Sequence, residues 1–431
     1  MSADISAFPT LDGFDPLSPE FLADPYPMLA RARREAPVFF YEPMSLWVIT
    51  RHEDLVTAVN DFETFSSRAT GVVPPPADLA HRVPRNLMEH AFIAIDPPKH
   101  TVVRKNANKA FTRGRIAALE ADIEEIAHGL LDGVVGRGAC DLMRDYCYPL
   151  SLEVIIRLLG MPPQDAPRFR QWTEDMFSLM GPVDADDPDA TTAKPMAEEE
   201  RRRRWTHMAE AYEYYTKFVE DRIAEPRDDL TSALVQVTDD EGRPAISPER
   251  ISTHIMELVA AGNDTTANLM GFMVRFFDAH PEQFAAVRRD PTLMANAVEE
   301  GLRMRGTSPG LFRITTRDVQ IAGTVIPKGS LVWLVYISGG RDEALFEEPD
   351  RFDIARPDAD KHLSFGRGRH MCMGAPLARL EARVGLNVLF ERIPDIRVVP
   401  DQEFVYDAVM TVVAMKSLLV EWDPRASKEI R

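Results

Sequence analysis

The sequence has few cysteines and no long apolar run. Its three cysteines, Cys140, Cys147 and Cys372, are too few and too widely spaced for a disulfide framework or a four-cysteine metal site. Nowhere do about eighteen apolar residues follow one another, as a membrane-spanning helix requires. Residues 1–15 also lack the positively charged start and the apolar stretch of a signal peptide. We therefore expect a cytoplasmic protein without a membrane partner.

Positive charge is also scarce. The 50 Lys and Arg residues are outnumbered by 68 Asp and Glu residues, which gives a net charge of −18. Because such a surface repels polyanions, nucleic acid is not expected as a partner. No Gly/Ser-rich linker, low-complexity tract or internal repeat divides the chain, so we predict a single domain over residues 1–431.

Helical spacing of apolar residues covers most of the chain. The pattern predicts one helix over residues 18–35, a short hairpin over residues 37–51, and helices over most of residues 53–300. Residues 315–337 alternate and contain β-branched side chains, which predicts a second small sheet. The sequence therefore favours a mainly α fold with small β-regions near both ends.

Residues 181–196 are rich in turn-forming and acidic residues, which predicts a loop between two helices. The run of four arginines that follows has the composition of a nucleic-acid patch. However, acidic partners precede these arginines at helical spacing, as Glu198–Arg202, Glu199–Arg203 and Glu200–Arg204. We interpret this stretch as the solvated face of a helix.

A long helix is expected after Ser247, because this serine is a good helix cap and Pro248 suits the first helical position. From Ile251 to Phe276, apolar or small residues recur at alternating spacings of four and three. This spacing indicates a core helix that is buried along one face.

The most specific stretch is residues 365–374, FGRGRHMCMG, immediately before an amphipathic helical pattern. Glycines let the backbone turn tightly against a flat partner, and a cysteine at a helix start lies where N–H groups and the helix dipole stabilise a thiolate. Such a thiolate can bind iron axially. The alternative is a glycine turn with an incidental cysteine. We interpret Cys140 and Cys147 as small buried hydrophobic residues.

The spacing Phe-Gly-x-Gly-x-His-x-Cys-x-Gly resembles the haem-binding signature of the cytochrome P450 superfamily. Every fixed position is matched, by Phe365, Gly366, Gly368, His370, Cys372 and Gly374. The resemblance extends from Trp47 to Leu418 and implies a haem-thiolate monooxygenase of the soluble bacterial type. It also implies the family's mainly helical α+β fold, a triangular prism, and haem b as cofactor with Cys372 as the axial ligand of the iron.

The resemblance further implies a buried charge network that holds the cysteine loop. Glu300 and Arg303 match the family's Glu-x-x-Arg helix, and Arg351 supplies the expected second arginine. Removing one member of such a network would leave an unpaired buried charge, at a cost of ~3–5 kcal/mol. Gly340 stands where the family often has asparagine, which leaves the local packing open.

Within the long helix, residues 261–266 (AGNDTT) resemble the family's oxygen-activation motif. Small residues such as Ala261 leave room over the haem, and the Thr265 hydroxyl can interrupt the helical hydrogen bonds and admit water. Asp264 can then relay protons inward. The resemblance thus assigns Asp264 and Thr265 as catalytic residues, whereas a structural polar cluster is the alternative.

Haem propionates are carboxylates that must be neutralised when the ring is buried. By resemblance, the residues that would neutralise them are His100, Arg104, Arg313 and His370. For His100 taken alone, a surface histidine with its hydrogen bonds satisfied is the alternative.

Positions that correspond to the family's substrate pocket are mostly apolar, which favours a small hydrophobic organic substrate. They include Met88, Phe92, Met176, Ala260, Leu311 and Met410. Glu257, eight residues before Thr265, is the exception. It either receives a basic or hydroxylated group of the substrate or is a structural or water-facing carboxylate.

The resemblance implies a reaction that consumes O2 and two electrons. Because the sequence contains no flavin or iron–sulfur module, we expect the electrons to come from a small acidic ferredoxin, [2Fe–2S] or similar, with its reductase. Basic residues around the cysteine loop and the neighbouring helix would receive the ferredoxin. They are Arg367, Arg369, Arg379, Lys105, Lys109 and Arg113.

Two other functions remain open. A peroxide-using haem oxygenase would be expected to lack the threonine–carboxylate pair, so Asp264 and Thr265 argue against it. A non-catalytic haem sensor would bind ligands without turnover, and no output domain is recognisable in the sequence.

Overall fold

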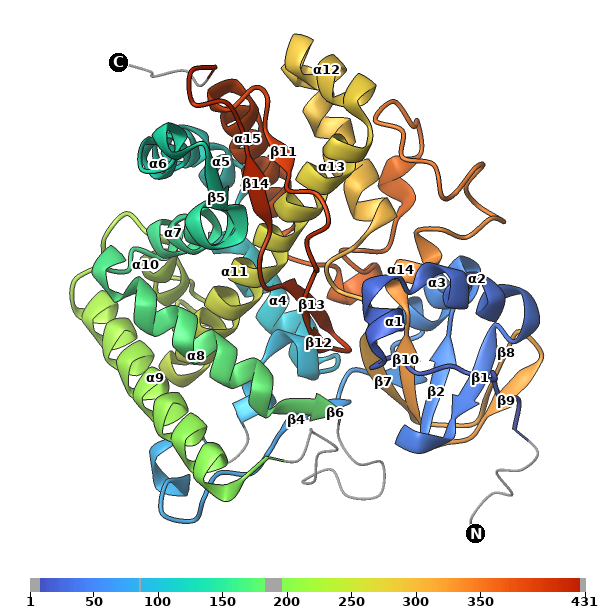
Figure 1. Ribbon diagram of the computed structural model, residues 1–431. Helices are drawn as coiled ribbons and strands as arrows, with labels where there is room; N and C mark the ends of the chain where they lie inside the picture. The colour runs from blue at the N-terminus through green and yellow to red at the C-terminus, as the bar shows by residue number, and fades with distance from the viewer. Residues whose placement is uncertain (1–7, 85–86, 183–195, 427–431) are drawn as a thin grey trace.

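The computed structural model describes residues 8–84, 87–182 and 196–426. These residues are mainly helical, with small sheets, as the sequence pattern predicts (Figure 1). The α-helices are α1, Pro19–Ala23; α2, Tyr26–Glu35; α3, His52–Asn60; α4, Lys99–Ala110; α5, Arg113–Ala117; α6, Glu120–Asp132; α7, Tyr148–Leu159; α8, Ala166–Leu179; α9, Glu198–Ala224; α10, Leu230–Val235; α11, Pro248–Ala279; α12, Pro281–Arg289; α13, Met294–Met304; α14, Tyr336–Gly339; and α15, Ala375–Arg392. Among the described residues, none of these helices is both long enough and apolar enough to cross a membrane.

The strands are short and form several sheets. They are β1, Val38–Tyr41; β2, Leu46–Ile49; β3, Phe65–Ser66; β4, Thr70–Val72; β5, Ala139–Asp141; β6, Met180–Pro182; β7, Leu311–Thr315; β8, Val319–Ile321; β9, Thr324–Ile326; β10, Leu331–Leu334; β11, Arg397–Val398; β12, Tyr406–Val409; β13, Val412–Met415; and β14, Leu419–Glu421. The largest sheet has five strands in the order β1-β2-β10-β7-β3. In Figure 1 this sheet lies with α1–α3 on one side of the molecule, opposite the helix-rich part.

The strands of residues 315–337 correct one prediction. We expected a separate second sheet there, but β10 pairs in parallel with β2, with Leu331 opposite Leu46. It also pairs antiparallel with β7, so it completes the sheet that begins near the N-terminus. Within residues 315–337, β8 and β9 form a separate two-stranded hairpin. Alternation along a segment predicts a strand, but it does not say which distant strand will be its partner.

The predicted helix over residues 18–35 is also wrong in one respect, because it is two helices. Asp24 has extended backbone angles of φ −147° and ψ 94° at the end of α1. The following residue, Pro25, disfavours a helical conformation at the residue before it. The chain therefore turns between Ala23 and Tyr26 before helical structure resumes.

The central helix α11 begins as predicted and runs through the middle of the molecule (Figure 1). The Ser247 hydroxyl caps it by accepting the Arg250 N–H at 3.4 Å, and Pro248 is its first residue. The helix packs against α7, α9 and α15, and most of its 32 residues are buried. Burial on several sides fixes the position of residues 261–266 in the core.

The arginine-rich start of α9 is more than a solvated face. Glu200 pairs with Arg204 at 2.7 Å, as predicted. Arg202 does not follow the predicted i,i+4 pattern, because its guanidinium instead donates to both oxygens of Asp78, at 2.9 and 2.6 Å. Spacing within a helix cannot reveal a partner from another segment. Of the predicted loop before α9, residues 183–195 lie outside the described residues.

The buried charge network contains Arg356 and not Arg351. Glu300 bonds Arg303 at 2.7 Å and Arg356 at 3.2 Å, and all three side chains are buried. Arg351 is 56% exposed and pairs with Glu348 and Asp353. The Arg351 assignment is therefore wrong. A short segment holds both arginines, and only the path of the backbone decides which of them turns inward.

Gly340 fits this network without the family's asparagine. Its carbonyl accepts a hydrogen bond from the Arg303 guanidinium at 2.9 Å. A Cβ atom at this position would collide with the Arg303 carbonyl oxygen. Glycine is thus the residue that lets this backbone approach the buried arginine so closely.

Candidate functional site

The loop before α15 is wound around Cys372. The Cys372 N–H donates to the Phe365 carbonyl at 2.8 Å, which closes the loop. Gly366 and Gly368 have positive φ angles of 64° and 69°, a conformation that L side chains rarely adopt. At Gly368 a Cβ would lie 2.9 Å from the Asn60 side-chain oxygen. The two glycines are therefore required by the turn that presents the cysteine.

Several groups favour a negative charge on the Cys372 sulfur. Burial raises the pKa of its thiol overall, and the Gly374 and Ala375 N–H groups and the Arg104 and Arg379 guanidinium groups act in the opposite direction. Gly374 caps α15, so these N–H groups belong to the helix start, as the sequence predicted. Cys372 retains accessible surface, whereas Cys147 is fully buried.

Two histidines and two arginines gather next to the cysteine loop. The rings of His100 and His370 lie 4.0 Å apart between centroids. Arg104 donates to the Met371 carbonyl at 2.8 Å, and the buried Arg313 donates to the Phe312 carbonyl at 2.7 Å. The four residues predicted to neutralise the propionates thus lie in one region, although they belong to α4, β7 and the cysteine loop.

This region favours a bound anion. Burial, helped by the positive charges of Arg104 and Arg369, lowers the pKa of His100 to about 4. Burial also lowers the pKa of His370 to about 3, with Arg313 and His100 acting in the same direction. His100 is buried and neither of its ring nitrogens has a hydrogen-bond partner among the described residues. Unpartnered donors among arginines fit the carboxylates of a haem b ring ligated by Cys372.

The polar residues in the middle of α11 are held by local hydrogen bonds. The Thr265 hydroxyl donates to the Ala261 carbonyl at 2.7 Å. The Asp264 carboxylate accepts from the Asn263 amide at 3.1 Å, and the Asp264 carbonyl accepts from Asn268 at 2.6 Å. Burial raises the pKa of Asp264 to about 6, helped by the negative charge of Glu174. A carboxyl with this pKa can exchange protons near neutral pH.

Small side chains leave space on one face of this helix. Ala261 is exposed, although its neighbour Ala260 is buried. A Cβ atom added at Gly262 would lie 3.4 Å from the Ile155 side chain, which is an ordinary contact distance. An exposed alanine in the middle of a core helix marks open space beside the helix, next to Asp264 and Thr265.

Three of the predicted pocket residues meet near the start of α4. The 3₁₀ turns Leu87–His90 and Phe92–Ala94 contain Met88, which is buried, and Phe92, which is half-buried. Both oxygens of Glu257 accept backbone N–H groups from this segment, from Phe92 at 2.9 Å and from Ile93 at 3.2 Å. Glu257 therefore anchors this segment, and its contact with a basic or hydroxylated group of the substrate stays a prediction.

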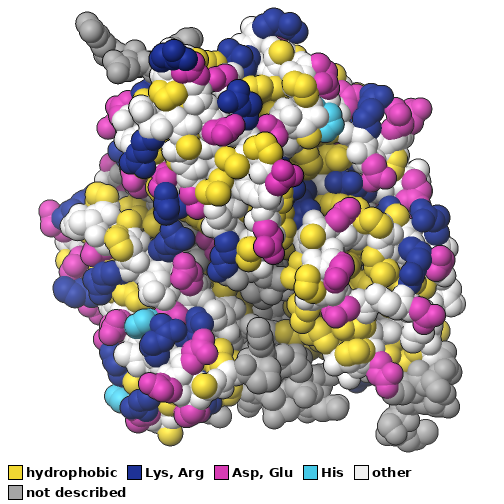
Figure 2. Space-filling view, viewed as in Figure 1, with side chains coloured by type: hydrophobic (Ala, Val, Ile, Leu, Met, Phe, Trp, Pro, Cys, Tyr) yellow, Lys and Arg dark blue, Asp and Glu magenta, His cyan; other side chains and the backbone are white. Residues whose placement is uncertain are grey.

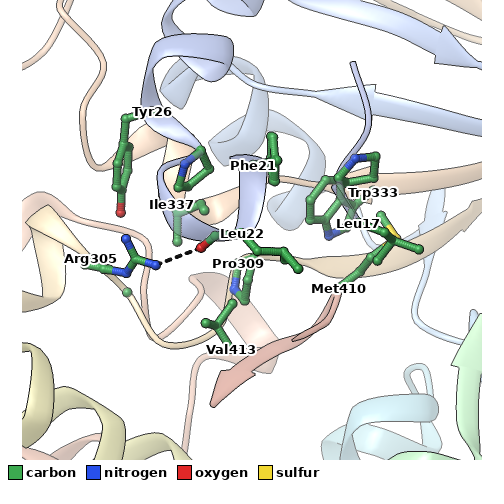
Figure 3. A pocket seen from close by; sticks show the side chains of 13 residues that line it. Leu17, Phe21, Leu22, Tyr26, Arg305, Pro309, Trp333, Ile337, Met410 and Val413 are labelled. Atoms are coloured by element: carbon green, nitrogen blue, oxygen red, sulfur yellow. Dashed lines mark hydrogen bonds between the residues drawn. The ribbon is translucent and has the colours of Figure 1, made fainter. Parts of the chain in front are cut away.

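The other predicted pocket residues are more widely distributed. Met176 is half-buried on α8 and packs against the main core, while Leu311 begins β7. Met410 lines a different, small apolar cavity of about 30 Å³ with Phe21 and Trp333 (Figure 3). This volume is close to that of one water molecule. Contact of Met410 with an organic substrate stays a prediction.

The sequence did not single out His254. It lies on α11 three residues before Glu257, is 1% exposed, and stacks on the Phe92 ring at 4.0 Å between centroids. The signal was present in the sequence, because His254 precedes Ala261 by seven residues and therefore lies on the same helical face. However, a single histidine within an apolar helical pattern does not by itself predict a ligand-binding role.

The predicted basic residues differ in how free their charges are. Arg379 forms two hydrogen bonds with Glu299, at 2.6 and 2.8 Å, and Lys109 donates to the Thr238 carbonyl at 3.0 Å. Arg369 lies over the Phe62 ring. Lys105 and Arg113 are exposed. On the face in Figure 2, basic and acidic side chains are interspersed and no block of one sign dominates.

Comparison with known proteins identifies relatives along nearly the whole chain. The family model described as Cytochrome P450 matches residues 40–393. Cytochrome P450 monooxygenase PikC of Streptomyces venezuelae is 36% identical over 423 residues, which are 96% of this chain and 94% of that protein. Vitamin D(3) 25-hydroxylase of Pseudonocardia autotrophica is 35% identical, with 96% and 97% covered. The structure of cytochrome P450 CYP109Q5 from Chondromyces apiculatus matches with a TM-score of 0.80 and 33% identity, over 94% of this chain and 97% of that one.

Proposed function

Because this chain belongs to the cytochrome P450 family of haem b monooxygenases, we propose that Cys372 is its haem ligand and that a separate ferredoxin supplies its electrons. We further propose that its substrate is a small hydrophobic organic molecule, into which one oxygen atom of O2 is inserted, and that it works in the cytoplasm. The observation that carries the proposal is the pair of Asp264 and Thr265 on α11 together with the cysteine loop.

Each side chain then has a defined task. When bound, the haem iron supplies the binding and reductive activation of dioxygen and the transfer of one oxygen atom. Cys372 would hold the iron as a thiolate that the helix-start N–H groups and two arginines help to stabilise. The Arg104 and Arg313 guanidinium groups would neutralise the two propionates. His100 and His370, which their lowered pKa values keep uncharged, would donate hydrogen bonds to them. The Glu300 network keeps the cysteine loop in place without touching the reacting atoms.

Asp264 and Thr265 manage protons and water. The Asp264 carboxyl has a pKa of about 6, so at neutral pH it can take up a proton and release it inward. The Thr265 hydroxyl can rotate from the Ala261 carbonyl and donate to an oxygen placed beside Ala261. The exposed face of Ala261 leaves room for that oxygen and for a substrate carbon.

The nature of the substrate is supported by the residues around the Phe92 segment. Met88, Phe92, Met176 and Ala260 offer apolar surface, which suits a hydrophobic molecule. One relative is named a vitamin D(3) 25-hydroxylase, and a solved P450 relative carries corticosterone. These names support a hydrophobic substrate for this chain but do not identify it.

The electron donor is supported by the exposed cations next to the cysteine loop. We expect a Lys105→Glu/Arg113→Glu variant to receive electrons more slowly from a [2Fe–2S] ferredoxin at low salt, with its haem content unchanged. Stopped-flow reduction under carbon monoxide would measure this. Arg289→Glu/Lys328→Glu, with the same change of net charge at exposed positions elsewhere, is the control. Equal, salt-independent rates for both variants would contradict the docking site.

The proposed function is tested by spectrum and by turnover. Dithionite and carbon monoxide should give the strongly red-shifted Soret band of a cysteinate-ligated haem, and Cys372→Ser should abolish it. With a ferredoxin, its reductase and ¹⁸O2, products should contain one ¹⁸O atom. Turnover with hydrogen peroxide but none with ferredoxin would favour the peroxide-using alternative. Ligand binding with no turnover by either route would favour a haem sensor.

A further inference from the structure

His254 continues the face of α11 on which Ala261 and Thr265 lie. It precedes them by seven and eleven residues, and both separations are close to whole numbers of helical turns. At about 1.5 Å of rise per residue, its Cα lies roughly 10 Å along the helix from that of Ala261. The histidine therefore lies about two helical turns from Ala261 on the same side of α11, a separation that a ten-carbon chain can span.

The ring of His254 is buried without any hydrogen bond. Its side chain is 1% exposed, and among the described residues neither Nδ1 nor Nε2 has a hydrogen-bond partner. The ring stacks on Phe92 with an interplanar angle of 17°, which fixes the ring plane, and both ring nitrogens are buried. A buried imidazole with no partner is uncommon and marks a place where a polar group from outside the chain binds.

The Glu257 carboxylate lies beside the His254 ring and gives this region its negative charge. Its Oε2 atom lies 3.7 Å from His254 Nδ1, too far for a direct hydrogen bond. The carboxylate is anchored by the Phe92 and Ile93 N–H groups, so it cannot easily swing away. Each oxygen still has a lone pair free to accept another hydrogen bond.

We propose that His254 and Glu257 form a polar subsite for an alcohol hydroxyl of an otherwise hydrophobic substrate. A neutral imidazole offers one donor and one acceptor, and a hydroxyl group offers the same two functions in return. A carboxylate ligand would be repelled by Glu257, whereas a hydroxyl group can donate to the carboxylate or to the acceptor nitrogen and accept from the imidazole N–H. This inference rests on the proposed function, because it names the chemical class of the monooxygenase's substrate.

Three ten-carbon probes that differ only at one end test the subsite. They are decan-1-ol, 1-chlorodecane and decanoate, each titrated into the ferric holoprotein and followed by the spin-state shift of the Soret band. We expect decan-1-ol to bind about tenfold more tightly than 1-chlorodecane, as one well-made buried hydrogen bond or two weaker ones would give. Decanoate should bind more weakly than the alcohol.

Two variants separate the roles of the pair. His254→Phe keeps the stack on Phe92 but removes both nitrogens, so the alcohol should lose its advantage over the chloride. Glu257→Gln removes the negative charge, so decanoate should gain affinity relative to decan-1-ol. Val325→Ala is the control, because this exposed side chain on β9 lies outside the predicted pocket and its loss should leave the alcohol-to-chloride ratio unchanged. A crystal structure with decan-1-ol should place its oxygen within hydrogen-bond distance of His254.

The outcomes distinguish this inference from the proposed function. If the wild-type protein shows the cysteinate spectrum but binds decan-1-ol no more tightly than 1-chlorodecane, or binds neither, the subsite is refuted while the enzyme assignment stands. The same holds if His254→Phe keeps the wild-type ratio with its haem content intact. Absence of the cysteinate spectrum in the wild type would instead refute the proposed function.

Discussion

The loop around Cys372 and the segment around Phe92 both build the candidate site, but they are held in different ways. The loop is closed by its own backbone bonds and tied to α13 through the Ser364 hydroxyl, which donates to the Leu302 carbonyl at 2.7 Å. The Phe92 segment has 3₁₀ turns and is anchored by the carboxylate of Glu257 from α11. One region is fixed beside a buried charge network, whereas the other is held against α11 mainly by two side chains, Glu257 and His254.

The difference separates the part of the enzyme that binds the haem from the part that selects the substrate. Holding a haem through a thiolate demands one geometry, and many bonds converge to give it. Binding a particular substrate requires a pocket lining whose residues can vary among relatives. A segment held by few contacts can vary in sequence without loss of the fold. Mutations should therefore cost stability in the first region and selectivity in the second.

The largest effect is expected where the network under the cysteine loop is broken. Arg356→Ala removes one of the two guanidinium partners of Glu300. It also removes the donor to three backbone carbonyls, those of Glu347, Glu348 and Arg351, so we expect a loss of ~3–5 kcal/mol in the free energy of unfolding. Haem content should fall as well. Arg351→Ala is the matched control, because that side chain is at the surface and should change neither quantity measurably. Denaturant unfolding and pyridine haemochrome assays measure both, and equal effects of the two variants would contradict the network described here.

The next effect concerns protons and leaves the fold intact. Asp264→Asn should lower the rate of product formation about 100-fold, because the amide cannot carry a proton inward, while the carbon monoxide spectrum stays the same. The wild-type rate should change around pH 6, where Asp264 titrates, and the variant should lack this inflection. Thr265→Ser keeps a hydroxyl and should keep most of the rate. A variant with the wild-type pH profile would remove Asp264 from the relay.

The same contrast explains what the sequence could predict. The cysteine loop was predicted because its glycines, histidine and cysteine lie within ten consecutive residues, so local spacing contains the whole geometry. Arg356 was missed because a second arginine, Arg351, lies five residues earlier, and neither residue type nor spacing says which one is buried. The partner of β10 and the stack of Phe92 on His254 join segments far apart in the chain. Such contacts depend on tertiary packing that a single sequence does not display.

A smaller effect is expected from a buried carboxyl on α15, the helix that begins after Cys372. Glu381 is buried and accepts a hydrogen bond from the Ser151 hydroxyl, and burial raises its pKa to about 8. Because the folded-state pKa is raised, the stability that this group contributes is present at low pH and lost as pH rises through 8. The wild type should lose on the order of 1 kcal/mol between pH 7 and pH 9 from this group. Glu381→Gln should lack this part of the loss in denaturant titrations at the two pH values, and parallel curves for both proteins would refute the shift.

The smallest effect is expected at the surface contact between α9 and residues 78–82, next to the Phe92 segment in sequence. The pairs Arg202–Asp78 and Arg82–Glu213 join them, and all four side chains are at least partly exposed. Arg202→Gln should raise the dissociation rate of a spin-shifting ligand about twofold at low salt, and the difference should vanish near about 0.5 M salt. Lys217→Gln breaks an exposed pair within α9 alone and should leave the rate unchanged. If both variants behave alike at every salt concentration, this contact does not help to close the site, and the Glu257 anchor remains the contact known to hold the Phe92 segment against α11.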